Sequence, residues 1–114
     1  MDSLSSIMVV KALDGLSTRA VATAENIANA STPGYRPLRV TFEQALKAAA
    51  SSGPDAIRAL TPEISRETGG APTELRVDLE LVEATATAGR YGALIDLLGR
   101  QMQLHSLAVS GGRR

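Results

Sequence analysis

The feature that constrains this fold most is a run of apolar residues at helical spacing in the last third of the chain. The run alternates steps of three and four residues over about four heptads, and it comprises Leu81, Ala84, Ala88, Tyr91, Ile95, Leu98, Met102, His105 and Val109. This alternation is typical of a helix that buries one stripe against a second helix. We predict a helix that begins at Asp78, a good N-cap residue, and ends at Gly111–Gly112.

The second helix that this pattern requires is predicted near the N-terminus, over residues 4–30. Its three–four stripe comprises Val10, Leu13, Ser17, Ala20, Ala24 and Ile27. One phenylalanine, two tyrosines and no tryptophan favour closely packed helices over a deep globular core. The predicted fold is mainly α, with long N- and C-terminal helices that pair as a coiled coil. Residues 1–32 and 77–112 would form one discontinuous domain, and residues 33–76 would supply a turn, a short helix and a mobile loop.

The middle of the chain is expected to lie outside the helix pair. Thr41 and Gln44 have the spacing of a capping box, which predicts a short helix from 42 to about 50. Residues 51–76 are rich in Ser, Thr, Gly and Pro, so we expect a flexible loop there. Short extended pieces are expected within it at 63–66 and 74–77.

Composition and charge argue against several classes of function. Twelve acidic and twelve basic residues balance and are scattered, which disfavours nucleic-acid binding and a polybasic membrane anchor. No apolar run reaches the roughly 18 residues that cross a bilayer, so no direct membrane insertion is expected. Cysteine is absent and the single histidine, His105, falls on the apolar stripe, so no catalytic or metal-binding set emerges. We expect no enzyme activity and no cofactor.

Three acids stand at the predicted start of the last helix: Asp78, Glu80 and Glu83. Such a cluster suggests a divalent-ion site, but a simpler explanation exists. Carboxylates near a helix N-terminus are stabilised by the cap geometry and by the helix dipole. We therefore interpret them as a helix start.

The most distinctive short motif lies at the end of the first helix, in the segment Glu25–Arg36. Asn26 and Asn29 are three residues apart and project from one side of the helix. Pro33–Gly34 cannot continue the helix and suits the central positions of a type II turn. The segment is therefore interpreted as a helix end that docks on a partner, with Tyr35 as an anchor. The alternative is that the asparagines cap this chain's own helix and that the tyrosine covers the turn.

Three glycines interrupt the last helix on one stripe beside the apolar residues: Gly89, Gly92 and Gly99. Each costs about 1 kcal/mol relative to alanine in a helix interior. The stripe is interpreted as a groove that another helix can enter. The alternative is a weak helix that frays.

The segment 25–36 resembles the N-terminal signature of the bacterial flagellar rod and hook family. There an Asn-Ile-Ala-Asn-x-x-Thr-Pro-Gly-Tyr stretch closes the first long helix, and this chain matches it at nearly every position. The region from Val77 to Gly112 is also similar to the closing helix of that family. The short middle and the Gly-Gly ending favour its proximal-rod subtype. The chain departs from the pattern at Gly92, where many relatives carry Gln, and near Thr87, where they often carry Asn.

The resemblance implies a structural subunit of the proximal rod of the bacterial flagellar basal body. Such subunits assemble into a helical tube that transmits torque and surrounds the export channel. The resemblance also implies export by the flagellar type III machinery without a cleaved signal peptide, and a final location in the periplasmic rod. Two alternatives stay open: a subunit at another level of the rod, and a small cytosolic helical adaptor or export chaperone.

The partners implied are copies of the chain itself, other flagellar rod proteins, the adaptor that joins the rod to the membrane ring, and the type III export machinery. The motif, the glycine stripe and the apolar run together give the candidate subunit interface. Its residues are Asn26, Ile27, Asn29, Pro33, Gly34, Tyr35, Gly89, Tyr91, Gly92, Leu98, Gly99 and Met102.

Overall fold

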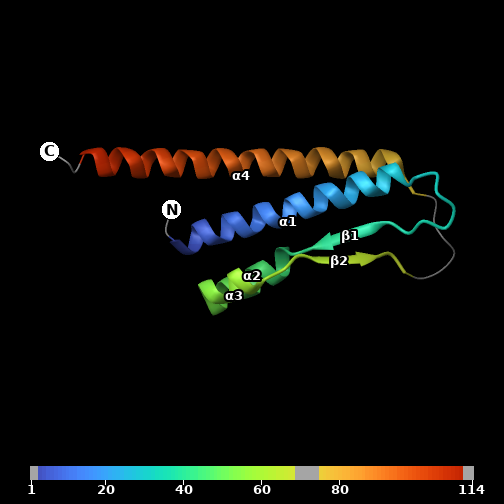
Figure 1. Cartoon of the computed structure of the whole chain (residues 1–114), viewed down its shortest axis with the longest axis horizontal. Helices are drawn as coiled ribbons and strands as arrows, with labels where there is room; N and C mark the ends of the chain where they lie inside the picture. The colour runs from blue at the N-terminus through green and yellow to red at the C-terminus, as the bar shows by residue number, and fades with distance from the viewer. Residues whose placement is uncertain (1–2, 69–74, 112–114) are drawn as a thin grey trace.

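Two long helices dominate the computed structural model, which describes residues 3–68 and 75–111 (Figure 1). In chain order its elements are α1 (Ser3–Ala28), β1 (Leu38–Thr41), α2 (Glu43–Ser52), α3 (Pro54–Ala59), β2 (Glu63–Arg66) and α4 (Val77–Gly111). α1 and α4 run antiparallel and pack against each other, with the short elements beside them. The predicted fold, mainly helical with paired terminal helices and a small middle, is confirmed.

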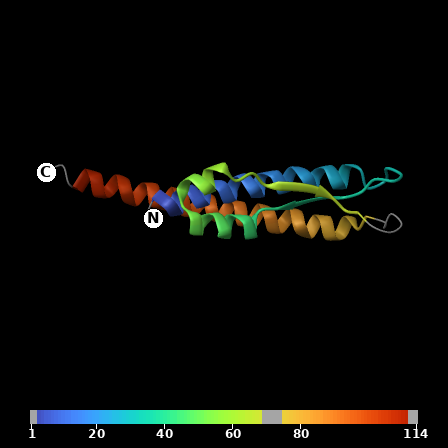
Figure 2. The same cartoon turned by 90° about the horizontal axis from the view of Figure 1, so that it is seen from below.

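α1 lies in the middle of the molecule. α4 covers one side of it, and β1, α2 and α3 pack on the other (Figures 1 and 2). The C-terminal end of α4 extends past the N-terminal end of α1 (Figure 1). The molecule is long and thin, with extents of 67 × 28 × 14 Å.

The small apolar core lies between α1 and the middle elements. It comprises Leu16, Ala22, Val40, Phe42, Leu46 and Ile57, and Leu94 of α4 packs against it. The Phe42 ring lies directly on Gly15 of α1, where an added Cβ would stand 2.5 Å from a ring carbon. Glycine is therefore required at this position by close packing rather than by backbone conformation.

A short helix, α3, forms within the segment expected to be a flexible loop, so that prediction is wrong for residues 54–59. Gly53 has a φ of +111°, and the chain then enters α3 with Pro54 in its first turn. Proline suits this place because its fixed φ fits the helix and its missing N–H is not needed. The Lys11 ammonium donates to the carbonyl oxygen of Leu60 at 2.8 Å and ties the end of α3 to α1.

The extended piece expected at 63–66 is confirmed as β2, which pairs antiparallel with β1. In this register Val40 lies opposite Ile64. The piece expected at 74–77 is not found in its described part, because Val77 already belongs to α4 and no strand forms at 75–76.

The predicted capping box is wrong, although the short helix itself forms. Thr41 ends β1, and Phe42 occupies the N-cap position of α2 without a side-chain cap. The Glu43 carboxylate accepts from the Phe42 N–H at 3.4 Å and is held mainly by Arg19. Burial of Phe42 and the ion pair of Glu43 therefore fix the start of this helix.

The stripe predicted for the first helix is mostly exposed, although Leu13 and Ile27 are half-buried. Val10, Ser17, Ala20 and Ala24 are exposed. The buried residues of α1 are instead Gly15, Leu16, Ala22, Thr23 and Asn26. Because elements pack on two sides of α1, its buried positions do not form the single stripe of a two-helix coiled coil.

The stripe predicted for the last helix is partly wrong, because every second inward position lies one residue earlier in the chain than predicted. Leu81, Ala88, Ile95 and Met102 are exposed, as are His105 and Val109. The inward positions are instead Glu80 and Thr87, both buried, followed by the half-buried Leu94 and Gln101. Ala84 and Leu98 are half-buried, in line with the prediction. Through Glu80, this inward side of α4 makes polar contacts with Asn26 of α1 and Arg39 of β1.

Candidate functional site

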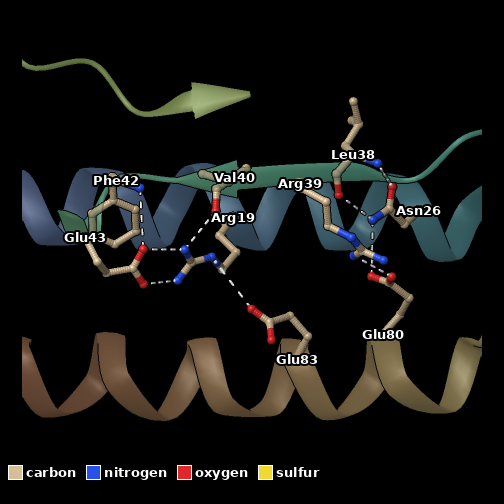
Figure 3. Close-up of polar contacts among 9 residues, drawn as sticks. All are labelled: Arg19, Asn26, Leu38, Arg39, Val40, Phe42, Glu43, Glu80 and Glu83. Carbon is tan, nitrogen blue, oxygen red and sulfur yellow. Dashed lines mark hydrogen bonds and ion pairs between the residues drawn. The ribbon is translucent and has the colours of Figure 1, made fainter. Parts of the chain in front are cut away.

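The most highly organised polar site joins the end of α1 to β1 and α4 (Figure 3). The Asn26 side chain, with no exposed surface, lies at its centre. The amide oxygen of Asn26 accepts from the Leu38 N–H at 2.8 Å and from the Tyr35 hydroxyl at 2.7 Å. Its nitrogen donates to the Leu38 carbonyl at 3.0 Å and to Glu80 Oε2 at 3.2 Å. We call Asn26, Tyr35, Leu38, Arg39 and Glu80 the polar junction.

Glu80 supplies the negative charge of the polar junction from the first turns of α4. Its side chain is 3 % exposed, and its Oε1 accepts from Arg39 Nη1 at 2.7 Å. Arg39 also donates through Nε to Glu67 at 2.8 Å. In the described part of the chain, every buried side-chain nitrogen and oxygen has a hydrogen-bond partner. The buried carboxylate is therefore compensated, as a buried charge must be.

A second ionic cluster lies two turns away along α1 and is centred on Arg19 (Figure 3). Its guanidinium donates to both carboxylate oxygens of Glu43, at 2.7 and 2.8 Å, and to the Val40 carbonyl at 2.8 Å. It also lies 3.7 Å from Glu83 of α4 and 4.9 Å from the centre of the Phe42 ring. The hydrogen bonds from Arg19 lower the pKa of Glu43 to about 2, and the same contact raises the pKa of Arg19.

These two clusters also supply hydrogen-bond partners for the backbone along the free edge of β1 in the two-stranded sheet of β1 and β2. The Glu67 N–H donates to the Pro37 carbonyl, so Pro37 and Glu67 form a hydrogen-bonded pair. Such pairs alternate with non-bonded pairs along an antiparallel ladder, so the N–H and C=O groups of Leu38 and Val40 point away from β2. Asn26 binds both groups of Leu38, and Arg19 binds the carbonyl of Val40. Side chains of α1 thus take the place of a third strand along β1.

Between β1 and α4 lies an open cleft of about 500 Å³. Its ionic lining comprises Arg19, Arg39, Arg90, Glu43, Glu80 and Glu83. Positive and negative groups balance, and most of them bind one another. Among the described residues, no group of three or more His, Asp or Glu side chains is placed to hold a metal ion. The arrangement fits a structural junction that fixes the position of α4 on α1.

The turn after α1 has the predicted geometry. The Tyr35 N–H donates to the Thr32 carbonyl at 3.2 Å across Pro33–Gly34, and Gly34 has a φ of +73°. This places glycine at the left-handed position that a type II turn requires. The turn brings the Tyr35 hydroxyl back onto the end of α1.

Both motif asparagines bind their own chain. Asn26 belongs to the polar junction, and Asn29 donates to the Glu25 carbonyl at 2.9 Å and accepts from the Thr32 hydroxyl at 3.2 Å. The Tyr35 hydroxyl donates to Asn26, and the Arg66 guanidinium carbon lies over the Tyr35 ring, 5.4 Å from the ring centre. The alternative that these side chains serve this chain's own helix end and turn accounts for their contacts. The remaining motif positions are the half-buried Ile27 and the exposed Pro33 and Gly34.

The candidate interface residues of α4 form a separate set along that helix. Gly89, Gly92 and Gly99 are exposed, and a Cβ added at any of them would meet nothing within 4 Å. Met102 is 66 % exposed and Tyr91 39 %, whereas Leu98 is half-buried. The structure brings Asn26 and Tyr35 together, but it does not join them to the glycine stripe. The glycine side of α4 remains uncovered in the single chain.

Sequence reasoning missed the charged members of the two clusters: Arg19, Arg39, Glu43 and Glu80. In the sequence, Glu80 has the pattern of a helix start. The heptad spacing of Glu80, Thr87 and Leu94, one residue ahead of the apolar stripe, is the signal that marks the inward side of this helix. A hydrophobic pattern does not include these positions, because buried helix positions are expected to be apolar.

Comparison with known proteins gives no family for this chain: no protein-family model and no curated protein sequence matches it. None of the described helices is long and apolar enough to cross a membrane.

Proposed function

We propose that this chain is a structural subunit of the proximal rod of the bacterial flagellar basal body, similar to the FlgB-like subunits. The resemblance of residues 25–36 and 77–112 to the rod and hook family supports this proposal. In the structure these two regions contain the end of α1 with its turn, and the helix that packs on α1. The polar junction connects them through Asn26 and Glu80.

The observation that carries the proposal is the apolar surface that α4 leaves uncovered. Large exposed apolar side chains occur from one end of the helix to the other: Leu81, Val82, Ile95, Leu97, Met102, Leu104, Leu107 and Val109. Exposed apolar surface on this scale marks a protein-binding face. On a long thin molecule, such a face suits side-by-side packing of subunits.

The proposed mechanism is assembly. Identical head-to-tail contacts that do not close a ring generate a helical object. The uncovered side of α4 would meet a neighbouring subunit, and the glycine stripe would let the neighbour's helix approach closely. The neighbours would be further copies, other rod proteins and the adaptor to the membrane ring. The chain would reach its place in the periplasmic rod by type III export without cleavage.

The test is the location of the chain in cells of the bacterium that encodes it. Quantitative mass spectrometry and cryo-electron microscopy of purified basal bodies should find it as a stoichiometric rod component. A position at another rod level would correct the subtype only. Absence from basal bodies together with a soluble complex in the cytosol would contradict the proposal and support the adaptor or chaperone alternative.

A pair of variants at one position tests the use of the glycine stripe. Gly92→Leu should reduce the amount of chain retained in basal bodies at least about tenfold, because its side chain fills space that the neighbour needs. Gly92→Ala is the matched control, since it also improves helix propensity but adds only a methyl group. Secreted protein measured in parallel separates failed assembly from failed export. Normal retention of Gly92→Leu would show that the stripe is not an interface.

A further inference from the structure

Both long helices present an apolar side that faces away from β1. Leu79, Glu83 and Arg90 of α4 line the cleft toward β1. At about 3.6 residues per turn, the opposite flank of α4 carries the exposed members of its apolar run. These are Leu81, Ala88, Ile95 and Met102.

α1 carries a matching stripe on the same side of the molecule. Gly15 and Ala22 of α1 are buried, the first against the Phe42 ring and the second beside the cleft that β1 lines. The two long helices lie side by side (Figures 1 and 2), and the side of α1 opposite to Gly15 and Ala22 continues the apolar flank of α4. It carries Val10, Leu13, Ser17, Ala20 and Ala24, all exposed except the half-buried Leu13. We call the two stripes together the two-helix face.

The two-helix face is free of charge. From Val10 to Ala24 and from Leu81 to Met102, every charged residue projects from another side of its helix. The apolar members are nonetheless open to solvent, since Val10 is 56 % exposed, Leu81 53 % and Met102 66 %. Exposed apolar groups without charged neighbours are typical of the core of a protein interface. Because the three–four apolar spacing of both stripes matches that of packed helices, the occupant of this face is helical.

The size of the face indicates which helices cover it. α1 has 26 residues, which at about 1.5 Å per residue make the face about 39 Å long. Two helices whose axes are about 8–10 Å apart give it a width of roughly 20 Å. A partner that covers all of it would bury roughly 800 Å² on each side, which is the standard size of a stable dimer interface. One added helix would cover about half of this area, whereas a second copy supplies two antiparallel helices of the required length.

The two stripes are also complementary in size. The stripe of α1 is rich in alanine and serine, whereas that of α4 has leucine, isoleucine and methionine. Large side chains opposite small ones fill an interface evenly. We propose that the chain forms a two-fold symmetric dimer through the two-helix face, in which α1 of each copy packs antiparallel on α4 of its partner. The four helices form a bundle in which all neighbours run antiparallel.

This dimer goes beyond the assembly proposed above, because a two-fold contact closes on itself and cannot propagate a tube. It does not depend on a flagellar role, and its tests use the purified chain rather than basal bodies. In a rod subunit it would precede incorporation, since it covers apolar residues of α4 that a rod neighbour would contact.

The first test is sedimentation of the purified full chain. Analytical ultracentrifugation should show a monomer–dimer equilibrium with a dissociation constant of about 10 μM or less. Ala88→Glu places a charge on the two-helix face and should weaken the dimer at least about tenfold. Ala86→Glu is the matched control, because Ala86 is exposed on the opposite flank of α4, and it should change the constant less than about threefold. Equal effects of the two variants, a monomer throughout the concentration range, or growth past the dimer would overturn the proposal.

The second test is disulfide formation between copies, which reports the helices that meet. The Asn26–Glu80 hydrogen bond sets the antiparallel register of α1 and α4. Ser17, nine residues before Asn26, therefore lies level with position 89, nine residues after Glu80. A two-fold axis parallel to the helices keeps this level, so Ser17 of one copy would lie against Ala88 of the other.

The chain has no cysteine, so a single introduced cysteine forms disulfides between copies alone. In an air-oxidised mixture of Ser17→Cys and Ala88→Cys, the mixed disulfide should exceed each same-variant disulfide at least about fivefold. Predominance of a same-variant disulfide, or a statistical ratio of all three products, would overturn the packing of α1 on the partner's α4.

Discussion

The two long helices of this molecule differ in how far the rest of the chain encloses them. α1 is packed by α4 on one side and by β1, α2 and α3 on the other, whereas α1 is the main neighbour of α4. α1 consequently contributes apolar core residues, and α4 buries only Glu80 and Thr87. The apolar residues of α4 largely face outward. The comparison shows that hydrophobic content alone does not identify which side of a helix its own chain buries.

The difference also separates two tasks along α4. Its inward side carries a compensated charge, and such contacts have strict geometric requirements. We infer that Glu80 fixes the rotation and axial position of α4 on α1. Its outward side carries apolar groups whose burial stabilises by about 25 cal/mol per Å² when a partner covers them. Polar contacts within the chain would then set the position of α4 on α1, and apolar contacts would supply the affinity of α4 for a neighbouring protein.

Removal of the Glu80 carboxylate should have the largest effect on the inward side. Glu80→Ala removes one acceptor from Arg39, which keeps Glu67, and one from the buried Asn26 amide, which keeps the Leu38 carbonyl, so the free energy of unfolding should fall by about 2–4 kcal/mol. Glu83→Ala is the matched control one turn along, where the 3.7 Å contact to Arg19 is partly exposed, and it should cost less than about 1 kcal/mol. Chemical denaturation followed by circular dichroism measures both. Equal losses would show that Glu80 has no special role.

The asparagines of the motif should differ from each other nearly as strongly. Asn26→Ala should destabilise the fold by about 2 kcal/mol, because the partly buried N–H and C=O groups of Leu38 lose their partners. Asn29→Ala should cost about 0.5 kcal/mol, since its contacts lie at an exposed helix end. The same unfolding measurement applies. A larger loss from Asn29→Ala would contradict the burial difference on which this expectation depends.

Glycine positions in the two helices should respond in opposite directions. Gly15→Ala places a methyl group against the Phe42 ring and should destabilise by about 1–2 kcal/mol. Gly92→Ala meets open space on α4 and should stabilise the isolated chain by up to about 1 kcal/mol. Thermal unfolding distinguishes the two signs. Destabilisation by Gly92→Ala would mean that this side of α4 is already covered.

The smallest expected effect is a pH dependence from the Arg19 cluster, in which Glu43 of α2 pairs with Arg19 of α1. The pKa of Glu43 is about 2 in the folded chain, below its ordinary value of 4.5. Its stabilising contribution is therefore present above pH 4.5 and is lost as the pH falls toward 2. Because the Glu43 side chain is 54 % exposed, the contribution should be about 1 kcal/mol or less.

The measurement is unfolding free energy between pH 6 and pH 3 for the wild type and for Glu43→Gln. The wild type should lose more stability over this range than the variant. Asp55→Asn is the control, since Asp55 lies on the open surface and, within residues 3–68 and 75–111, pairs with Arg58 alone. Parallel curves for the wild type and Glu43→Gln would refute the role of the Arg19 contact.

The sequence predicted the elements of the fold well where their signals are local. Helical spacing located both long helices, and Pro33–Gly34 gave the turn with its left-handed glycine. The extended piece at 63–66 was predicted, but α3 and the pairing of β2 with β1 were not, because residues 53–66 carry turn-forming residues and their order depends on tertiary contacts. Lys11 binding at the end of α3 and the pairing of Ile64 with Val40 are two such contacts.

The polar junction could not be predicted because its members are scattered in sequence and belong to residue types that usually lie at the surface. Arg39 and Glu80 are ordinary charged residues until β1 and α4 bring them together. Asn26 was singled out, but the motif could not tell whether its amide would bind this chain or a neighbour. The prediction of Leu81 rather than Glu80 as an inward residue of α4 has the same origin, since a hydrophobic pattern does not anticipate a buried carboxylate that is paired with a cation.

The long sequence separations within the polar junction determine the order in which the chain can fold. Asn26 meets Leu38 across 12 residues, but it meets Glu80 across 54. Closing a longer loop costs more chain entropy, and distant contacts form later on average. We therefore expect the end of α1, the turn and β1 to form an early nucleus that already presents Asn26 and Arg39. α4 then docks last, and the contacts of Glu80 with Asn26 and Arg39 form in this final step.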